Sequence, residues 1–178
     1  MKTIVAPLDK GQIKKLKAGD EVLLSGEIYT ARDQAHKRFI EAISKRKKLP
    51  FDFKNQIIYY CGPNPGKKGR PIGSCGPTTS SRVDKFTPAL IKAGIRGMIG
   101  KGARAKEIVT AVKKYKAVYL LAPAGLGALI SKFVKKAKVV CYKDLGPEAV
   151  YKFKVSKLPL IVAIDAKGNN IFTVHSNR

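Results

Sequence analysis

The stretch GMIGKGARAKEIVTAVKKYKAVYLLAP, Gly97 to Pro123, decides the fold class because two kinds of residue pattern alternate in it. GMIGKG is typical of a short strand that ends in a turn, and ARAKEIVTAVKKY has the pattern of a helix. AVYLLAP is apolar almost throughout, as buried strands are. A strand, a helix and another strand in succession are typical of α/β proteins. The stretch therefore predicts an α/β domain.

The segments on either side continue this alternation. Strands are predicted for TIVAP, for Asp20 to Tyr29 and for NQIIYYCG, and a helix with an apolar stripe at Phe39 and Ile43 runs to about Lys45. The last third is mostly β, with three predicted strands in AKVVCYKD, AVYKFKVS and PLIVAIDAKG. We therefore expect a single compact domain, residues 1–178, with a mixed sheet flanked by helices.

Two helix starts are predicted from capping residues. Thr30 and Asp33 have the spacing of a capping box, so Thr30 is expected to be the N-cap of the helix that follows. Thr87 is expected to cap the helix TPALIKAGI, with Pro88 at its first position.

Length and composition are typical of one globular domain. The chain has 178 residues, of which 44% are hydrophobic. The longest apolar run, from Ala117 to Ile130, contains Pro123 and two glycines and is shorter than the roughly 20 residues of a membrane span. The N-terminus lacks an apolar signal core, so we expect a cytoplasmic protein without membrane attachment.

The cysteines favour neither disulfides nor zinc. Cys61, Cys75 and Cys141 share no C-x-x-C spacing, and an odd number of cysteines leaves one without a partner. We expect reduced thiols and no metal site in this chain.

The net charge is the strongest feature of the composition. The chain carries 36 Lys and Arg residues against 12 Asp and Glu residues, a formal charge of +24, which attracts anions of any kind. The basic runs SKRKK, GKKGR and SKFVKKAK contain almost no aromatic residues, whereas nucleic-acid modules usually interleave the two. A solvated lysine-rich surface ranks first, an acidic partner subunit second and nucleic acid third.

Three separate segments offer cations and hydrogen-bond donors, and the first is YTARDQAHKR. Arg32 and His36 lie four residues apart, on one face of the predicted helix. Unpaired N–H groups at a helix N-terminus favour an anion, and Arg32 would reinforce that preference. Asp33 is equally explained as a capping residue, and His36 as a surface or interface histidine.

The second and third segments are GSCGPTTSSR and MIGKGARAKE. Four hydroxyl residues follow the Gly76-Pro77 turn, and Arg82 adds a planar cation that can bind a carboxylate through two hydrogen bonds. Lys101 lies between two glycines, which permit close approach of a ligand. A hydroxyl-rich capping loop and a turn lysine are the alternatives. Taken together, the three segments favour a small polyanionic ligand.

These segments also carry a family resemblance. SGEIYTARDQAHKR, YYCGP, GSCGPTTSSRVDKFTP, MIGKG and DLGPEAVYKFKVSKLPLIVAIDAKGNN resemble, in order, the β subunit of two-subunit class I fumarate hydratases. These iron–sulfur hydro-lyases include L-tartrate dehydratase, and the resemblance spans Gly26 to Asn170. It implies a swivelling β/β/α domain and reversible hydration of the dicarboxylate fumarate to L-malate. It also implies a partner α subunit that carries a [4Fe–4S] cluster. The two kinds of subunit would assemble into a higher hetero-oligomer.

The resemblance implies roles for individual residues. Thr78 matches the proposed base that removes a proton from the carbon next to a substrate carboxylate. The positions that match the family's substrate-binding residues are Arg32, Arg82, Lys101, Asp33 and His36. The three cations among them would bind the carboxylates and stabilise the charge that develops in the transition state. They therefore count with Thr78 as candidate catalytic residues.

Three functions remain open at this point. Fumarate hydration ranks first, and dehydration of L-tartrate or another C4 diacid is the alternative, since part of the pocket belongs to the α subunit. A basic nucleic-acid-binding protein is the non-enzymatic alternative. If the chain is an enzyme subunit, we expect it to bind no specific nucleic acid. In the family the cluster cysteines belong to the α subunit, so Cys61 and Cys75 are expected to be structural.

Overall fold

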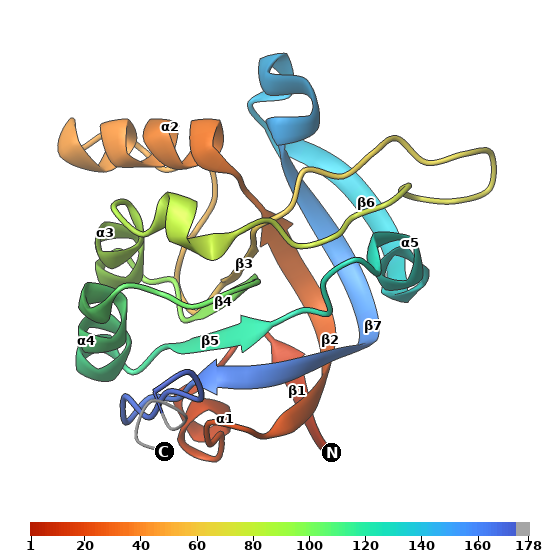
Figure 1. Cartoon of the computed structure of the whole chain (residues 1–178). Coiled ribbons are helices and arrows are strands. Elements are labelled where there is room, and N and C mark those ends of the chain that lie inside the picture. Colours follow the sequence, from red (N-terminus) through yellow and green to blue (C-terminus); the bar gives the residue numbers. More distant parts are fainter. Residues whose placement is uncertain (174–178) are drawn as a thin grey trace.

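The computed structural model describes residues 1–173 and contains a mixed sheet of seven strands flanked by helices (Figure 1). The strands occur in the sheet in the order β1-β2-β3-β4-β5-β7-β6. Their bounds are β1 Lys2–Ala6, β2 Glu21–Thr30, β3 Ile57–Tyr59, β4 Gly97–Gly100, β5 Val118–Leu121, β6 Val134–Cys141 and β7 Val150–Ile164. The α/β fold with a mixed sheet, predicted from the alternation of segments, is confirmed.

The sheet closes on itself. Each of β1 to β4 runs parallel to the next strand, whereas β7 runs antiparallel to β2, β5 and β6. Because β7 pairs with both β2 and β5, the strands β2-β3-β4-β5-β7 form a closed barrel, with β1 and β6 attached beside it (Figure 1). Closure brings the N-terminal and C-terminal thirds of the chain together.

The closed sheet separates two hydrophobic cores. Ile57 and Tyr59 of β3 belong to the core inside the barrel, whereas Ile58 and the following Tyr60 belong to the core beneath the helices. Successive strand residues point to opposite faces, so a strand buried on both sides is apolar along its length. This burial explains why NQIIYYCG has no polar alternation.

Three of the helices cover the outside of the barrel, whereas the other two contribute Ile13 and Ile130 to the core inside it. The helix bounds are α1 Lys10–Lys14, α2 Asp33–Ser44, α3 Thr87–Lys92, α4 Lys106–Tyr115 and α5 Gly127–Ile130, with short 3₁₀ turns η1 Ser80–Val83, η2 Ser131–Phe133 and η3 Lys143–Glu148. Figure 1 shows α2, α3 and α4 on one flank of the sheet and α5 on the other, next to β6. Within residues 1–173 no helix combines the length and the apolar character needed to cross a bilayer.

The predicted start of α2 is wrong by two residues. The N-cap is Arg32, and no side chain caps the helix. Thr30 is instead the last residue of β2, and its hydroxyl accepts a hydrogen bond from the Tyr151 N–H at 3.1 Å. The Thr30 hydroxyl was predicted from local spacing to cap the helix, but it bonds instead to the C-terminal third of the chain.

The predicted cap of α3 is also wrong. Phe86 occupies the N-cap position and Thr87 is the first helical residue, with Pro88 after it. The Thr87 hydroxyl donates to the Val83 carbonyl at 2.9 Å, in the preceding turn. Local spacing cannot distinguish this backward hydrogen bond from a cap.

Where three strands were predicted, from Ala137 to Gly168, the structure has two, β6 and β7. AVYKFKVS and PLIVAIDAKG form one strand, β7, with an irregularity where the boundary was predicted. Lys157 has a φ of 52°, and its N–H donates to the Ser25 hydroxyl at 2.9 Å. A β-bulge of this kind bends a strand without ending it. The bend lets β7 pair first with β6 and then with β5.

Candidate active site

Residues from the three predicted segments meet at the carboxyl ends of parallel strands. Arg32 follows β2 and Lys101 follows β4. The loop that carries Thr78 crosses between these ends, because the Thr78 N–H donates to the Tyr60 carbonyl at 2.7 Å and the Ser80 N–H donates to the Lys101 carbonyl at 3.0 Å. This end of a parallel α/β sheet is where ligands commonly bind.

The Thr78 hydroxyl has a fixed position. Its Oγ1 donates to the Tyr60 carbonyl at 3.0 Å, the same oxygen that accepts from its N–H. The neighbouring Thr79 is exposed and forms an isolated bridge with Lys101. Two adjacent threonines of the same chemistry are thus distinguished by their contacts, and the one matched to the family's base is the one held in place.

Gly100 allows the loop to lie against β4. A Cβ at this position would lie 1.9 Å from Ser80 Oγ and 2.8 Å from Tyr60 Cδ2. Ser80 is buried there, and the Tyr119 hydroxyl lies 2.9 Å from Ser80 Oγ and 2.8 Å from the Gly102 carbonyl oxygen. Because a hydroxyl has one proton, Tyr119 donates to the carbonyl and accepts from Ser80. The glycine is required by this close approach.

Arg32 lies over the end of β3 with an unsatisfied donor. Its Cδ packs so closely on Gly62 that a Cβ there would lie 2.8 Å away. Its Nε is buried and has no hydrogen-bond partner among residues 1–173, and its nearest carboxylate, Glu148, is 3.9 Å away. A buried donor without a partner is costly. Arg32 is therefore suited to donate a hydrogen bond to an anionic ligand.

Asp33 and Arg82 form an ion pair across the site, with 3.3 Å between Arg82 Nη2 and Asp33 Oδ2. The Arg82 side chain is 59% exposed. An exposed pair of this kind contributes about 0–1 kcal/mol to stability. Its main effect is to hold the Arg82 guanidinium near the N-terminus of α2, next to Arg32.

His36 lies beneath the site and not on its surface. It is fully buried, and its ring lies against those of Tyr60 and Phe86. Nδ1 is 2.7 Å from the Arg32 carbonyl oxygen, so Nδ1 carries the proton and donates. Burial, reinforced by the positive charge of Arg104, lowers the pKa of His36 to about 4. His36 is therefore neutral, and it orients the Arg32 backbone without reaching solvent in this chain.

The buried neutral His36 should make stability depend on pH. Its pKa is about 4 in the folded chain against 6.5 for an exposed histidine, so the unfolded state binds the proton first as the pH falls. Stability is full above about pH 6.5 and decreases toward pH 4, by about 3 kcal/mol at most. His36→Asn keeps a donor for the Arg32 carbonyl but does not titrate. Urea denaturation between these pH values should show that the free energy of unfolding depends less on pH in the variant than in the unmodified chain. An identical pH dependence would contradict the burial of a neutral histidine.

Arg104 is a site residue that the sequence analysis missed. Its side chain is fully buried, and its Nε donates to Asp84 Oδ1 at 2.5 Å. The guanidinium also donates to the Thr87 hydroxyl at 2.9 Å and lies over the rings of Tyr60 and Tyr119. Nothing in the surrounding sequence, which is rich in small and basic residues, indicates that this arginine is buried.

The cysteines do not form a cluster site. Cys61, Cys75 and Cys141 are all free thiols, and a hydrogen bond to Cys75, together with burial, raises the pKa of Cys61. Burial also raises the pKa of Cys141, to about 11. Among residues 1–173 no group of three or more His, Cys, Asp or Glu side chains is placed to hold a metal ion. The side chains of residues 1–173 therefore do not fit a [4Fe–4S] ligand set.

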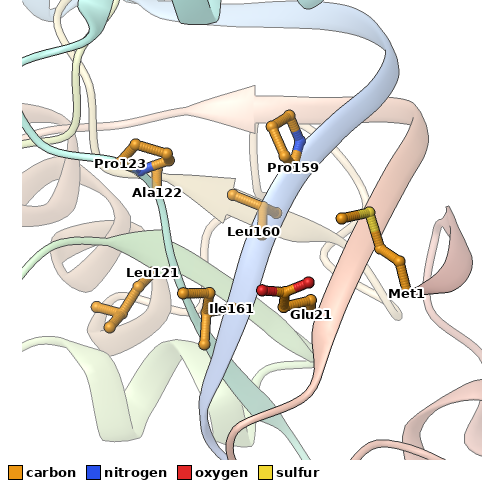
Figure 2. A pocket seen from close by; sticks show the side chains of 8 residues that line it. All are labelled: Met1, Glu21, Leu121, Ala122, Pro123, Pro159, Leu160 and Ile161. Carbon is orange, nitrogen blue, oxygen red and sulfur yellow. The ribbon is translucent and has the colours of Figure 1, made fainter.

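Residues 1–173 form surface cavities of about 370 to 590 Å³, and none of these is lined by Arg32, Thr78, Arg82 or Lys101. The cavity of about 590 Å³ is lined by Pro63, Pro147 and Tyr151, among others. An apolar cavity of about 390 Å³ is lined by residues of the neighbouring strands β2, β7 and β5, among them Glu21, Ile161 and Leu121 (Figure 2). Another, of about 520 Å³, is lined by lysines of β6 and β7. The candidate residues instead form an open cationic edge.

Comparison with known proteins decides the family. The family described as Fumarase C-terminus matches residues 3–175. This chain belongs to the Fumarase C-terminus family. Over 171 residues it is 44% identical to a protein of Methanocaldococcus jannaschii provisionally named L(+)-tartrate dehydratase subunit beta, covering 93% of this chain and 88% of that one. It is 32% identical to the L(+)-tartrate dehydratase subunit beta of Escherichia coli K12, with coverage of 96% and 86%.

Other relatives of this Fumarase C-terminus chain are much longer. Fumarate hydratase 1, mitochondrial, of Leishmania major is 38% identical, with 84% of this chain matched to 28% of that protein. The anaerobic class I fumarate hydratase of E. coli K12 is 34% identical, with coverage of 97% and 31%. The chain thus spans less than a third of these hydratases but most of the two β subunits. The resemblance to class I fumarate hydratases and tartrate dehydratases is confirmed, and the named relatives are hydro-lyases.

Proposed function

We propose that this chain is the β subunit of a two-subunit hydro-lyase that adds water reversibly to fumarate, giving L-malate. The observation that carries the proposal is the gathering of Thr78, Arg82, Lys101 and Arg32 at one end of the parallel strands, with the buried Arg32 Nε lacking a partner. A C4 dicarboxylate needs a cationic contact for each carboxylate, and this edge supplies three cations.

Thr78 serves as the base in this proposal. In the direction from malate, its Oγ1 removes the proton from the carbon next to a carboxylate, and in the direction from fumarate it returns that proton. A threonine hydroxyl is a weak base in water, so its alkoxide requires nearby cations and N–H donors. Lys101 and Arg82 are the cations that flank the loop.

Arg82, Arg32 and Lys101 bind the substrate. The planar guanidinium of Arg82 can bind one carboxylate through two hydrogen bonds, and Asp33 already orients it. Arg32 adds a donor at the N-terminus of α2, where the helix dipole also favours a negative charge. The neutral His36 then has a positioning role, because it holds the carbonyl of Arg32 from below.

The proposal requires an α subunit. The family resemblance implies a [4Fe–4S] cluster, and the proposal assigns that cluster to the partner. No group of three or more His, Cys, Asp or Glu side chains in residues 1–173 is placed to hold a metal ion. An open edge that presents Thr78 and three cations is what one half of a shared site would look like. We expect the assembly to be a higher hetero-oligomer in which the partner covers this edge.

L-tartrate dehydration is the second candidate function. Two relatives that match this chain over most of their length are named as tartrate dehydratase β subunits, one provisionally, and the first is 44% identical. L-tartrate differs from L-malate by one hydroxyl group. The same base and the same carboxylate contacts would serve either substrate.

Anaerobic co-expression with the α subunit tests the proposal. After cluster reconstitution, we expect turnover of fumarate and L-malate with kcat/KM at least about tenfold above that for either tartrate isomer, a difference of about 1.4 kcal/mol. The isolated chain should contain no stoichiometric iron and should not hydrate fumarate. Turnover by the isolated chain would remove the two-subunit proposal, and turnover of L-tartrate alone would favour the second candidate.

The non-enzymatic alternative rests on the positive charge, part of which is concentrated on β6 and β7. Lys136 lies opposite Lys154, and Lys138 lies opposite Lys152. Like charges in register repel. Of these four lysines, only Lys152 has a carboxylate partner within residues 1–173, Glu27 at 3.0 Å. This lysine face is the natural place for non-specific contact with a polyanion.

We expect nucleic-acid binding to be weak, non-specific and sensitive to salt. Each phosphate contact releases counterions, so binding through lysines alone decreases steeply as salt rises. Titration of a labelled DNA duplex at increasing salt should show binding that disappears near physiological ionic strength. Lys136→Glu with Lys154→Glu should abolish the binding seen at low salt. Nanomolar, sequence-specific binding at physiological salt would instead favour the nucleic-acid function.

A further inference from the structure

A buried ion pair joins the two loops that carry the candidate residues. Asp84 ends the turn that follows the hydroxyl-rich loop, and Arg104 lies in the loop after β4. Besides its contact with Arg104 Nε, the Asp84 carboxylate accepts a hydrogen bond from the Ala105 N–H at 2.8 Å. Both oxygens of Asp84 are therefore used, and both bonds come from the second loop.

The pair is continuous with the contacts that fix Thr78. The guanidinium of Arg104 is 5.2 Å from the centre of the Tyr60 ring and reaches the Tyr60 hydroxyl at 3.4 Å. The carbonyl of the same Tyr60 accepts from both the N–H and the hydroxyl of Thr78. Arg104 thus contacts the residue that holds Thr78, without contacting Thr78 itself.

The same pair fixes the loop of Lys101. The guanidinium lies 4.8 Å from the centre of the Tyr119 ring, and the Tyr119 hydroxyl bonds Ser80 in the first loop and Gly102 in the second. Beside it, the Ser80 N–H donates to the Lys101 carbonyl. The distance between Thr78 and Lys101 is therefore set by contacts grouped around a single buried guanidinium.

We propose that Arg104, paired with Asp84, is a positioning residue for the reaction: it locks the Thr78 loop to the Lys101 loop so that the base and its stabilising cation stay in register. The proposal rests on the proposed function, since it assumes that Thr78 and Lys101 act on the substrate. A planar guanidinium is needed because it donates to Asp84 and Thr87 at once while lying over two aromatic rings. A lysine ammonium keeps the charge but cannot make this arrangement.

Arg96 provides a matched control. It is partly buried, whereas Arg104 is fully buried, and its guanidinium donates to the carbonyls of Ile91 and Ile95. It precedes β4, whereas Arg104 follows that strand, so it lies at the opposite end from the candidate residues. Arg96→Lys therefore measures how much kcat changes when a guanidinium that only supports the fold is lost.

The test compares Arg104→Lys and Arg96→Lys in the reconstituted enzyme. Small displacements of reacting groups cost up to about 10²-fold in rate, so we expect Arg104→Lys to lower kcat at least about tenfold, with KM within about threefold of the unmodified enzyme. Arg96→Lys should leave kcat within about twofold. Because Arg104 acts through Thr78, adding Arg104→Lys to a chain that already carries Thr78→Val should lower kcat by less than about threefold further.

Hydrogen exchange gives a second readout that does not depend on turnover. The amide of Ser80, which bonds the Lys101 carbonyl, should exchange at least about tenfold faster in Arg104→Lys than in Arg96→Lys. Unchanged exchange, equal kcat values for the two variants, or a full multiplicative loss in the Thr78→Val background would each overturn the proposal. Normal turnover of Thr78→Val alone would instead refute the base assignment, and with it the claim that Arg104 acts through Thr78. Faster exchange in Arg104→Lys would then show only that Arg104 joins the two loops.

Discussion

Thr78→Val should lower the kcat of the assembled enzyme by at least about 10²-fold, the lower range for loss of a general base. Valine keeps the branched shape of threonine and removes only the hydroxyl. The Thr78 N–H still donates to the Tyr60 carbonyl in the variant, so the loop should keep its course. KM should change little, because the cations that bind the carboxylates are untouched. Steady-state kinetics with fumarate and with L-malate measure both values.

Thr79→Val is the matched control for this variant. Thr79 has the same chemistry, but its side chain is exposed and the structure assigns it no fixed contact at the base position. We expect a decrease in kcat of about tenfold or less. Equal losses for the two variants, or a normal kcat for Thr78→Val, would mean that these hydroxyls only shape the loop.

Lys101→Met should lower kcat/KM by about 10²- to 10³-fold, the loss expected when one donor to a developing negative charge is removed. The backbone role of Lys101 is to accept from the Ser80 N–H, and this contact does not depend on its side chain. Methionine also keeps the length and the apolar stem of lysine. The substitution therefore tests the ammonium group alone, and both kcat and KM should change, since the cation binds the substrate and stabilises its charge.

Lys106→Met controls for the loss of one positive charge from a chain of net charge +24. Lys106 is the exposed first residue of α4, close to Lys101 in the sequence. We expect kcat/KM within about twofold of the unmodified enzyme at physiological salt, where surface charges are screened. If the two lysine variants lose activity equally, the effect comes from the overall field and Lys101 has no specific role.

The mixed α/β fold could be predicted because its strands are buried on both faces. AVYLLAP and NQIIYYCG are apolar without alternation, and amphipathic helical segments separate such strands. The caps at Thr30 and Thr87 could not be predicted, because both hydroxyls bond elsewhere, one of them to distant Tyr151. The continuity of β7 could not be predicted either. The sequence around Lys157 is typical of a strand end, and only the structure shows that a left-handed residue there continues the strand.

The composition of the candidate site could be predicted, but its support could not. Arg32, Arg82 and Lys101 were found from motifs and Thr78 from the family resemblance, and the carboxyl ends of parallel strands bring their segments together. Their chemical roles stay predictions until the variants are measured. Arg104 was missed because arginines are usually exposed, and its burial depends on an aspartate and two tyrosines from other segments.

The sequence by itself determined the alternation of strands and helices in the first two thirds of the chain, the excess of positive charge, the lack of metal-ligand spacing among the cysteines and the cations that lie near hydroxyls. These are local properties, set by the residue and its immediate neighbours. Only the tertiary structure decided that β7 closes the barrel on β2, that His36 is neutral and that Arg104 is buried against Asp84. Burial and pairing depend on contacts between segments far apart in the chain, and a residue's own neighbours in sequence carry little information about them.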